Sequence, residues 1–219
     1  MAKLIRELLE TVEWRLEETI AAFTVTRAIN ERCMNDVSLN LKERINSRSG
    51  FWKPVTVGLQ TTVFLGICAI LDKNSDDSAT LYLILKKLKN TRPELPTIPA
   101  NLEIDLDVIR TRYSRFRHKL FGHNDINREV IANIFDEAGF TWDSIASDLA
   151  ELEYIFKVLW HLESGNNIPD RPSAEKMIYP YRMFVAKSQI DTLEFLDEIC
   201  NANQATLLPR IKKQYDPLY

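Results

Sequence analysis

The sequence predicts an all-α protein, a bundle of packed helices. Apolar residues recur at spacings of three and four through most of its 219 positions, the pattern that collects them on one side of an α-helix. No window alternates apolar and polar residues between turn residues, as a half-buried strand would. Apolar residues make up 45% of the chain and charged residues 27%, with only 6 glycines, so the composition indicates a folded globular protein with a sizeable core.

The first predicted helix extends from Leu4 to at least Ala28. Charged residues interrupt its apolar residues from the third position onward, and we therefore expect no secretory signal. The other faces of this helix carry glutamate and arginine. Its apolar stripe consists of Leu4, Leu8, Val12, Leu16, Ile20 and Phe23.

The longest uncharged run, residues 55 to 71, predicts a second helix that the others surround at the centre of the bundle. Pro54 before it suits the first turn of a helix. The run is shorter than the roughly 20 apolar residues that span a bilayer and contains Gln60, so we expect no membrane association. The three cysteines include no C-x-x-C pair, which favours a reducing compartment, the cytoplasm.

Two further helices frame a proline-rich segment. The first is a short surface helix for which Ser78 is the expected cap. Residues 91 to 100 contain three prolines and are expected to form an extended crossing loop, because proline removes a donor and disfavours helix before it. The second helix ends at Gly122, a candidate left-handed C-cap. Its stripe consists of Leu106, Ile109, Tyr113, Phe116 and Leu120.

The last third of the chain predicts a division at residue 165. Residues 130 to 135 indicate a helix closed by Gly139, and Thr141 with Asp143 begins another that continues to Leu159. Residues 164 to 173 have the composition of a linker, and a last helix with Ser188 as cap precedes a tail. We therefore expect a helical bundle over residues 1–165 and a helical extension over 166–219, made of a linker, a short helix and a C-terminal tail.

Positive charge gathers on one helix of an otherwise acidic protein. The net charge is −3, so no overall positive field attracts nucleic acid. Between Asp107 and Asp125 there is no acidic residue at all. The ordinary interpretation of such a run is a solvated face that pairs with acids on neighbouring helices. The cations and histidines of this segment are Arg110, Arg112, Arg115, Arg117, Lys119, His118 and His123.

Arg117 and His123 stand out within this segment. Arg117 lies seven residues after Arg110, on the same face and beside the apolar stripe. On a continuous helix, six residues at about 100° each would leave His123 some 240° from Arg117. The two side chains therefore meet only if the helix breaks at Gly122, or if two chains contribute across a dimer axis.

The segment YSRFRHKLFGHND, residues 113–125, resembles the R-x4-6-H signature of the HEPN superfamily, the higher-eukaryote and prokaryote nucleotide-binding helical domains. The resemblance is to the abortive-infection U-like branch and spans roughly residues 50 to 160. It implies a HEPN-like up-and-down helical bundle, with Arg117 and His123 as the signature pair and His118 as its polar second position. HEPN toxins paired with a nucleotidyltransferase antitoxin resemble R-x4-H-x-Y, whereas Asp125 stands here in place of that tyrosine.

Many HEPN members are metal-independent ribonucleases, and the resemblance implies such an endoribonuclease, of toxin or phage-defence type. In this hypothesis RNA is cut by 2′-hydroxyl attack at a site formed by R-x5-H motifs across a homodimer. His123 transfers protons, Arg117 stabilises the transition state and His118 contacts phosphate or a ring. Neither metal nor cofactor is expected. Phosphate contacts are expected from Arg110, Arg112, Arg115 and Lys119, with Asn124 and Asp125 supporting the site.

A non-catalytic helical module that dimerises or binds RNA is the alternative. In that case carbonyls at the helix end satisfy His123, and Arg117 pairs with an acid such as Asp125. The expected partners are RNA, a second copy of the chain, and an antitoxin or regulatory protein.

Other conspicuous residues are expected to be structural. His161 suits the negative end of a helix. The acidic cluster of Asp72, Asp76 and Asp77 lacks the spacing and glycine of a calcium loop. Aromatic residues at helical spacing are expected in the core or a dimer interface, and these are Trp142, Tyr154, Phe156 and Trp160.

Overall fold

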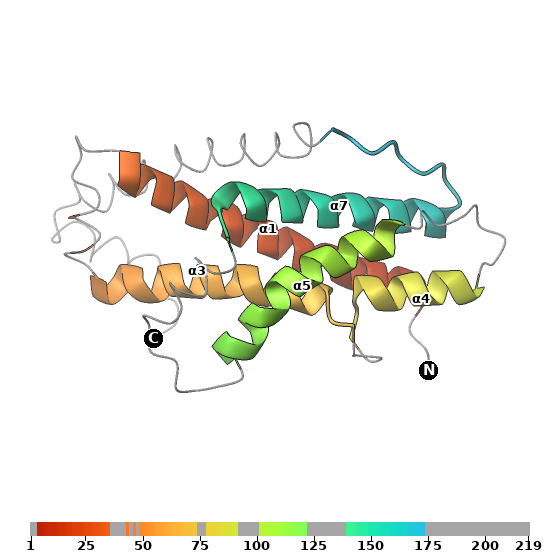
Figure 1. Ribbon diagram of the computed structural model, residues 1–219, viewed down its shortest axis with the longest axis horizontal. Helices are drawn as coiled ribbons and strands as arrows, with labels where there is room; N and C mark the ends of the chain where they lie inside the picture. Colours follow the sequence, from red (N-terminus) through yellow and green to blue (C-terminus); the bar gives the residue numbers. More distant parts are fainter. Residues whose placement is uncertain are drawn as a thin grey trace, which may run out of the picture.

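The computed structural model describes residues 4–35, 43, 46, 49–73, 78–91, 101–121 and 139–173. Within these ranges the chain forms five helices and no strand, which confirms the all-α prediction for this part of the protein. The helices shown in Figure 1 are α1 (Ile5–Asn35), α3 (Ser49–Ile70), α4 (Leu81–Thr91), α5 (Asn101–Phe121) and α7 (Trp142–Ser164).

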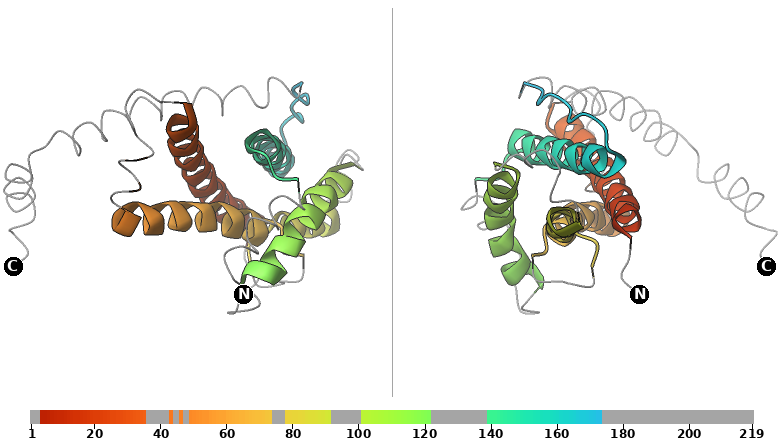
Figure 2. Two further views of the ribbon diagram at one scale, coloured as in Figure 1. Left: turned by 60° about the vertical axis from the view of Figure 1, so that its left-hand side comes forward. Right: turned by 90° about the vertical axis from the view of Figure 1, so that its right-hand side faces the viewer.

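The helices pack around α3 and α4, which follow one another along the long axis of the molecule. In the right-hand view of Figure 2 they are seen nearly end-on, with α5, α7 and α1 around them. Helix α1 contacts α3, α4 and α7, and α5 crosses α3 obliquely (Figure 1). One continuous core lies between the helices. Its largest fully buried side chains are Leu8, Leu9, Phe23, Ile67, Ile70, Leu81, Ile84, Leu88, Leu102 and Tyr113.

The apolar stripe of α1 confirms the prediction of a long first helix. Leu8, Val12, Leu16 and Phe23 are all buried. Ile20 is partly buried and packs against the core. Leu4 is 69% exposed, because it precedes the first helical residue and extends past the packed turns.

Helix α3 differs in two ways from its prediction. It begins at Ser49, so Pro54 lies inside it and removes one backbone hydrogen bond from its first turns. It is also not buried on every side, because Val57 and Leu65 are 49% and 42% exposed. Its neighbours α1 and α5 cover one side only. By length and composition Trp52–Ile70 could cross a membrane, and 28% of that window is buried in the fold.

Helix α4 is capped by Thr80. The Thr80 hydroxyl accepts a hydrogen bond from the Leu83 backbone N–H at 3.1 Å. The predicted cap, Ser78, is wrong because Thr80, not Ser78, immediately precedes the first helical residue. Arg15 of α1 donates to the Ala79 carbonyl at 3.0 Å and so attaches this turn to the bundle.

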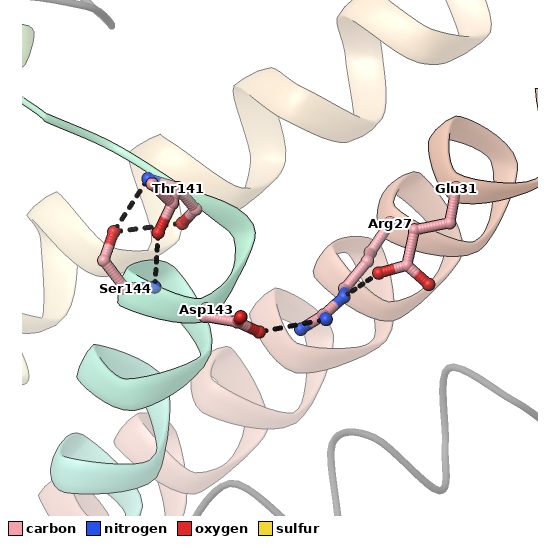
Figure 3. A network of polar contacts seen from close by, with 5 residues as sticks. All are labelled: Arg27, Glu31, Thr141, Asp143 and Ser144. Atoms are coloured by element: carbon pink, nitrogen blue, oxygen red, sulfur yellow. Dashed lines mark hydrogen bonds and ion pairs between the residues drawn. The ribbon is translucent and has the colours of Figure 1, made fainter. Parts of the chain in front are cut away.

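The start of α7 confirms the predicted cap at Thr141. Thr141 and Ser144 form a reciprocal capping box, in which each side chain accepts from the other's backbone N–H at 3.0 and 2.9 Å. Within the same turn, Asp143 accepts a hydrogen bond from Arg27 of α1 at 3.0 Å. Arg27 also pairs with Glu31 (Figure 3). The cap and this ion-pair network therefore fix where α7 begins against α1.

The segment after α7 is held against the bundle although its composition is that of a linker. Helix α7 ends at Gly165, which adopts the left-handed conformation with φ 70°. Arg171 pairs with Asp105 of α5 and Glu151 of α7, and its guanidinium lies 5.5 Å from the Tyr154 ring centre. The division at 165/166 stays a prediction. The crossing loop beyond residue 91, the helix over 130–135 and the helix from Ser188 with its tail lie outside the described residues.

Candidate functional site

The predicted signature pair lies at and beyond the C-terminal end of α5. This helix reaches Phe121, as its apolar stripe predicts, so Arg117 and His118 occupy its last turns. For Arg115, Arg117, His118 and Lys119 only the helical backbone is described. His123, Asn124 and Asp125 lie outside the described residues, so the convergence of Arg117 with His123 stays a prediction.

Tyr113 fixes the rotation of α5 about its own axis. This side chain is 1% exposed, and its ring centre lies 4.8 Å from that of Phe140 and 5.9 Å from that of Phe64 on α3. The Cys68 thiol also contacts the Tyr113 carbonyl at 3.8 Å. Tyr113 lies one turn before Arg117. Its burial therefore fixes on which side of α5, relative to the bundle, position 117 lies.

Arg112 lies on the flank of α5 that contacts α7. Its guanidinium, which we predict as an RNA-phosphate contact, pairs with Asp148 at 2.9 Å. Asp148 is 5% exposed, and burial raises its pKa to about 6, against the opposing effect of the Arg112 cation. Burial and the neighbouring Asp148 carboxylate also raise the pKa of Tyr113. In this arrangement Arg112 anchors the motif helix to α7.

Arg110 lies on the opposite flank, towards α4. Three residues earlier, Asp107 accepts a 2.6 Å hydrogen bond from the Tyr82 hydroxyl of α4, and Lys73 pairs with the same carboxylate at 3.2 Å. The Tyr82 hydrogen bond lowers the pKa of Asp107, and the cations of Lys73 and Arg110 act in the same direction. Position 117 follows Arg110 by seven residues and so belongs to this flank.

Lysines that no sequence pattern assigns to the site gather beside this flank, on α4 and in the turn before it. Lys73 lies in a turn, and the sequence places Lys86 and Lys89 only at the negative C-terminal end of a short helix. That helix is predicted to lie on the surface, but most of its residues are buried. The available signal is the K-K-x-K run at the end of that helix, residues 86–89. Helical spacing alone does not reveal that α4 packs beside α5.

The residues expected to be structural fit that expectation where they are described. The His161 ring nitrogen Nδ1 lies 2.9 Å from the Asn167 carbonyl, so the imidazole joins the end of α7 to the next segment. Phe156 is buried, and Trp142, Tyr154 and Trp160 pack against the core. Asp76 and Asp77 lie outside the described residues. Among the described residues, no group of three or more His, Cys, Asp or Glu side chains is arranged to hold a metal ion.

A comparison with known families identifies the chain. The model of the AbiU2 family, a family of HEPN domains, matches residues 5–178. That range contains all five described helices together with the segment from Arg117 to His123. Among curated proteins and solved structures, no match was found. Because the matched range is the greater part of the chain and the helices are those expected of the family, the protein belongs to the AbiU2 family of HEPN domains.

Proposed function

We propose that this protein is a metal-independent endoribonuclease of toxin or phage-defence type. The observation that carries the proposal is the R-x5-H motif, Arg117 to His123, inside the range matched by a HEPN family. The motif begins on the last turns of α5, a helix that Tyr113 and the Arg112–Asp148 pair attach to the core. Such attachment suits a catalytic group, because transition-state contacts require fixed positions.

The chemistry needs a proton acceptor, a proton donor and a cation. The 2′-hydroxyl of RNA attacks the adjacent phosphodiester, and the 5′-oxygen leaves. Histidine titrates near pH 6.5, so His123 acts as base or acid at neutral pH. Arg117 offers a planar set of donors to the non-bridging phosphate oxygens and stabilises the charge of the transition state. His118 contacts phosphate or a nucleotide ring. Dependence on the 2′-hydroxyl makes the activity specific for RNA.

The second part of the proposal is a homodimer whose two motifs form one site. Support comes from the outer face of α5 itself, where Ile104 and Val108 are 63% and 56% exposed. They are four residues apart and hence adjacent on the helix surface. Large exposed apolar side chains on the motif helix suit a contact with a second chain. Arg117 follows Val108 by nine residues, about 180° round the helix, so this contact supports dimerisation and not by itself a shared site. We also propose a cytoplasmic location and regulation by an antitoxin or another partner protein.

The experiment is an RNA digest without metal. Wild-type protein and the Arg117→Ala/His123→Ala variant are incubated with total RNA in EDTA, and the product ends are identified. We expect cleavage by the wild type alone, leaving 2′,3′-cyclic phosphate ends. Circular dichroism and mass in solution establish that the variant is folded. If neither protein cleaves, the proposal is overturned for this form of the protein and the non-catalytic RNA-binding or dimerisation module is favoured.

A further inference from the structure

A lysine-lined pocket opens beside the motif helix, at the opposite end from the turns that carry Arg117. It has a volume of 290 Å³ and is lined by residues of α4, of the turn before it and of the first turn of α5. Its lining includes three lysines, Lys73, Lys86 and Lys89, together with Asn90 and Glu103. The volume is at the bottom of the ~300–1,000 Å³ range of small-molecule pockets, so it suits one phosphate with its sugar. We call this site the lysine pocket.

Two carboxylates of α5 hold lysines at the rim of the lysine pocket. Lys89 pairs with Glu103 at 2.8 Å, and Lys73 pairs with Asp107 at 3.2 Å. Lys73 also lies 5.1 Å from the centre of the Tyr82 ring. Each ammonium has three donors, so a bound carboxylate leaves others for a phosphate oxygen. All four partners are between 40% and 48% exposed, and surface pairs of this kind contribute little and exchange readily.

The helical register connects the lysine pocket to the signature arginine. Glu103, Asp107 and Arg110 follow each other at spacings of four and three, and Arg117 follows Arg110 after seven. These spacings place all four positions on one flank of α5. From Glu103 to Arg117 the helix rises about 21 Å at 1.5 Å per residue. A stacked strand of about six nucleotides, at ~3.4 Å each, covers that length.

We propose that the lysine pocket is an RNA-phosphate subsite that holds the strand several nucleotides from the bond cut at Arg117. The inference rests on the proposed function, because Arg117 defines the cleavage point. A polyanion that follows this flank of α5 meets Arg110 between the two ends. The protein carries net charge −3, so a local group of three lysines concentrates binding where the overall charge repels RNA.

The test measures binding without cleavage. The probe is a fluorescein-labelled RNA of twelve nucleotides with 2′-O-methyl groups, which cannot supply the attacking hydroxyl, compared with a three-nucleotide probe of the same kind. The test variants are Lys86→Gln/Lys89→Gln and, separately, Lys73→Gln. The control is Lys53→Gln/Lys157→Gln, which removes the same charge from α3 and α7. Melting temperatures establish that all variants fold.

We expect the Lys86→Gln/Lys89→Gln variant to bind the twelve-nucleotide probe at least ~10-fold more weakly than the control. Its plot of log affinity against log salt should be less steep by about 1.4, since each phosphate contact with a single strand contributes ~0.7. The preference for the long probe over the short one should fall. If test and control variants bind alike, or if the wild type binds neither probe, the subsite is overturned.

Cleavage assays separate this inference from the proposed function. A wild type that cuts RNA, with equal binding by test and control variants, refutes the lysine pocket and leaves the ribonuclease. A wild type that cuts nothing, but loses RNA binding when the pocket lysines are changed, supports the pocket and refutes the ribonuclease.

Discussion

Asp148 combines deep burial with a single charged partner. The pKa of this carboxyl rises from 3.8 to about 6, because burial disfavours its charge more than Arg112 supports it. The folded protein therefore holds the proton more tightly than the unfolded chain between about pH 4 and pH 6. In that window stability falls as the pH rises, since the folded state must release a proton that the unfolded state has already lost.

Asp148→Asn should remove this pH dependence. Between pH 4 and pH 7 the difference in free energy of unfolding between variant and wild type should shift by about 2 kcal/mol in favour of the variant, at ~1.4 kcal/mol per pKa unit. Urea denaturation at several pH values measures it. Asp170→Asn, at an exposed carboxyl, is the control. A difference that stays constant with pH would contradict the assigned burial effect.

His123 and His161 provide a matched pair for the catalytic hypothesis. Expression of the active protein should arrest growth, and His123→Ala should relieve the arrest, because loss of a general acid or base reduces a rate by ~10²–10⁴-fold. His161→Ala removes an imidazole that contacts only the segment after α7 in the described residues, so it should leave the arrest in place. Growth curves of the wild-type, His123→Ala and His161→Ala strains, at matched protein levels, measure the arrest. Equal growth of all three strains would argue against catalysis in that host.

At the scale of elements, α1 and α3 approach closely at one glycine. A Cβ built on Gly66 would lie 2.0 Å from the Thr19 hydroxyl oxygen of α1. That hydroxyl is held by a 2.6 Å hydrogen bond to the Arg15 carbonyl, and Thr19 is buried. The side chain cannot move away without losing this bond, so the glycine sets the distance between the two helices.

Gly66→Ala should destabilise the protein by about 1–3 kcal/mol through overpacking. Gly58→Ala is the control, because the same helix offers open space there and alanine favours helix over glycine by about 0.5–1 kcal/mol. Thermal or urea unfolding of both variants measures the effect. The contact assigned to Gly66 is wrong if both substitutions change stability in the same direction.

At the scale of the whole molecule, exposed apolar side chains on α3 and α5 are candidate interfaces for the proposed homodimer. One is Val57 with Leu65 on α3, and the other is Ile104 with Val108 on α5. We assign the proposed dimer to the second, because it lies on the helix that carries Arg117. The outer face of α5 lies opposite its buried stripe, so a second chain can meet it without disturbing the core.

Val108→Glu should therefore convert the dimer to single chains of 25.4 kDa and abolish RNA cleavage. Val57→Glu introduces the same charge at a similarly exposed valine of α3 and should leave both the dimer and cleavage intact. Light scattering after size exclusion gives the masses. A dimer that survives Val108→Glu but not Val57→Glu would move the interface to α3.

The local sequence by itself determined the helices, the cap at Thr141 and the family. These features depend on residues within one or two turns, where the 3.6-residue period and the capping side chains act directly. The Arg117 to His123 motif is equally local. Ser78 and the all-round burial of residues 55–71 were predicted wrongly, because the exact first residue of a helix and the coverage of its faces depend on neighbouring helices.

Only the tertiary structure decided how the charges of α5 are used. Arg112 meets an acid 36 residues away on α7, whereas Asp107 meets Tyr82 and Lys73 from the other side. Spacing along α5 shows which positions share a flank. Spacing does not show which flank faces α7 and which faces α4. That depends on the rotation of α5 about its axis, which Tyr113 and the rest of the core fix through packing between segments distant in sequence.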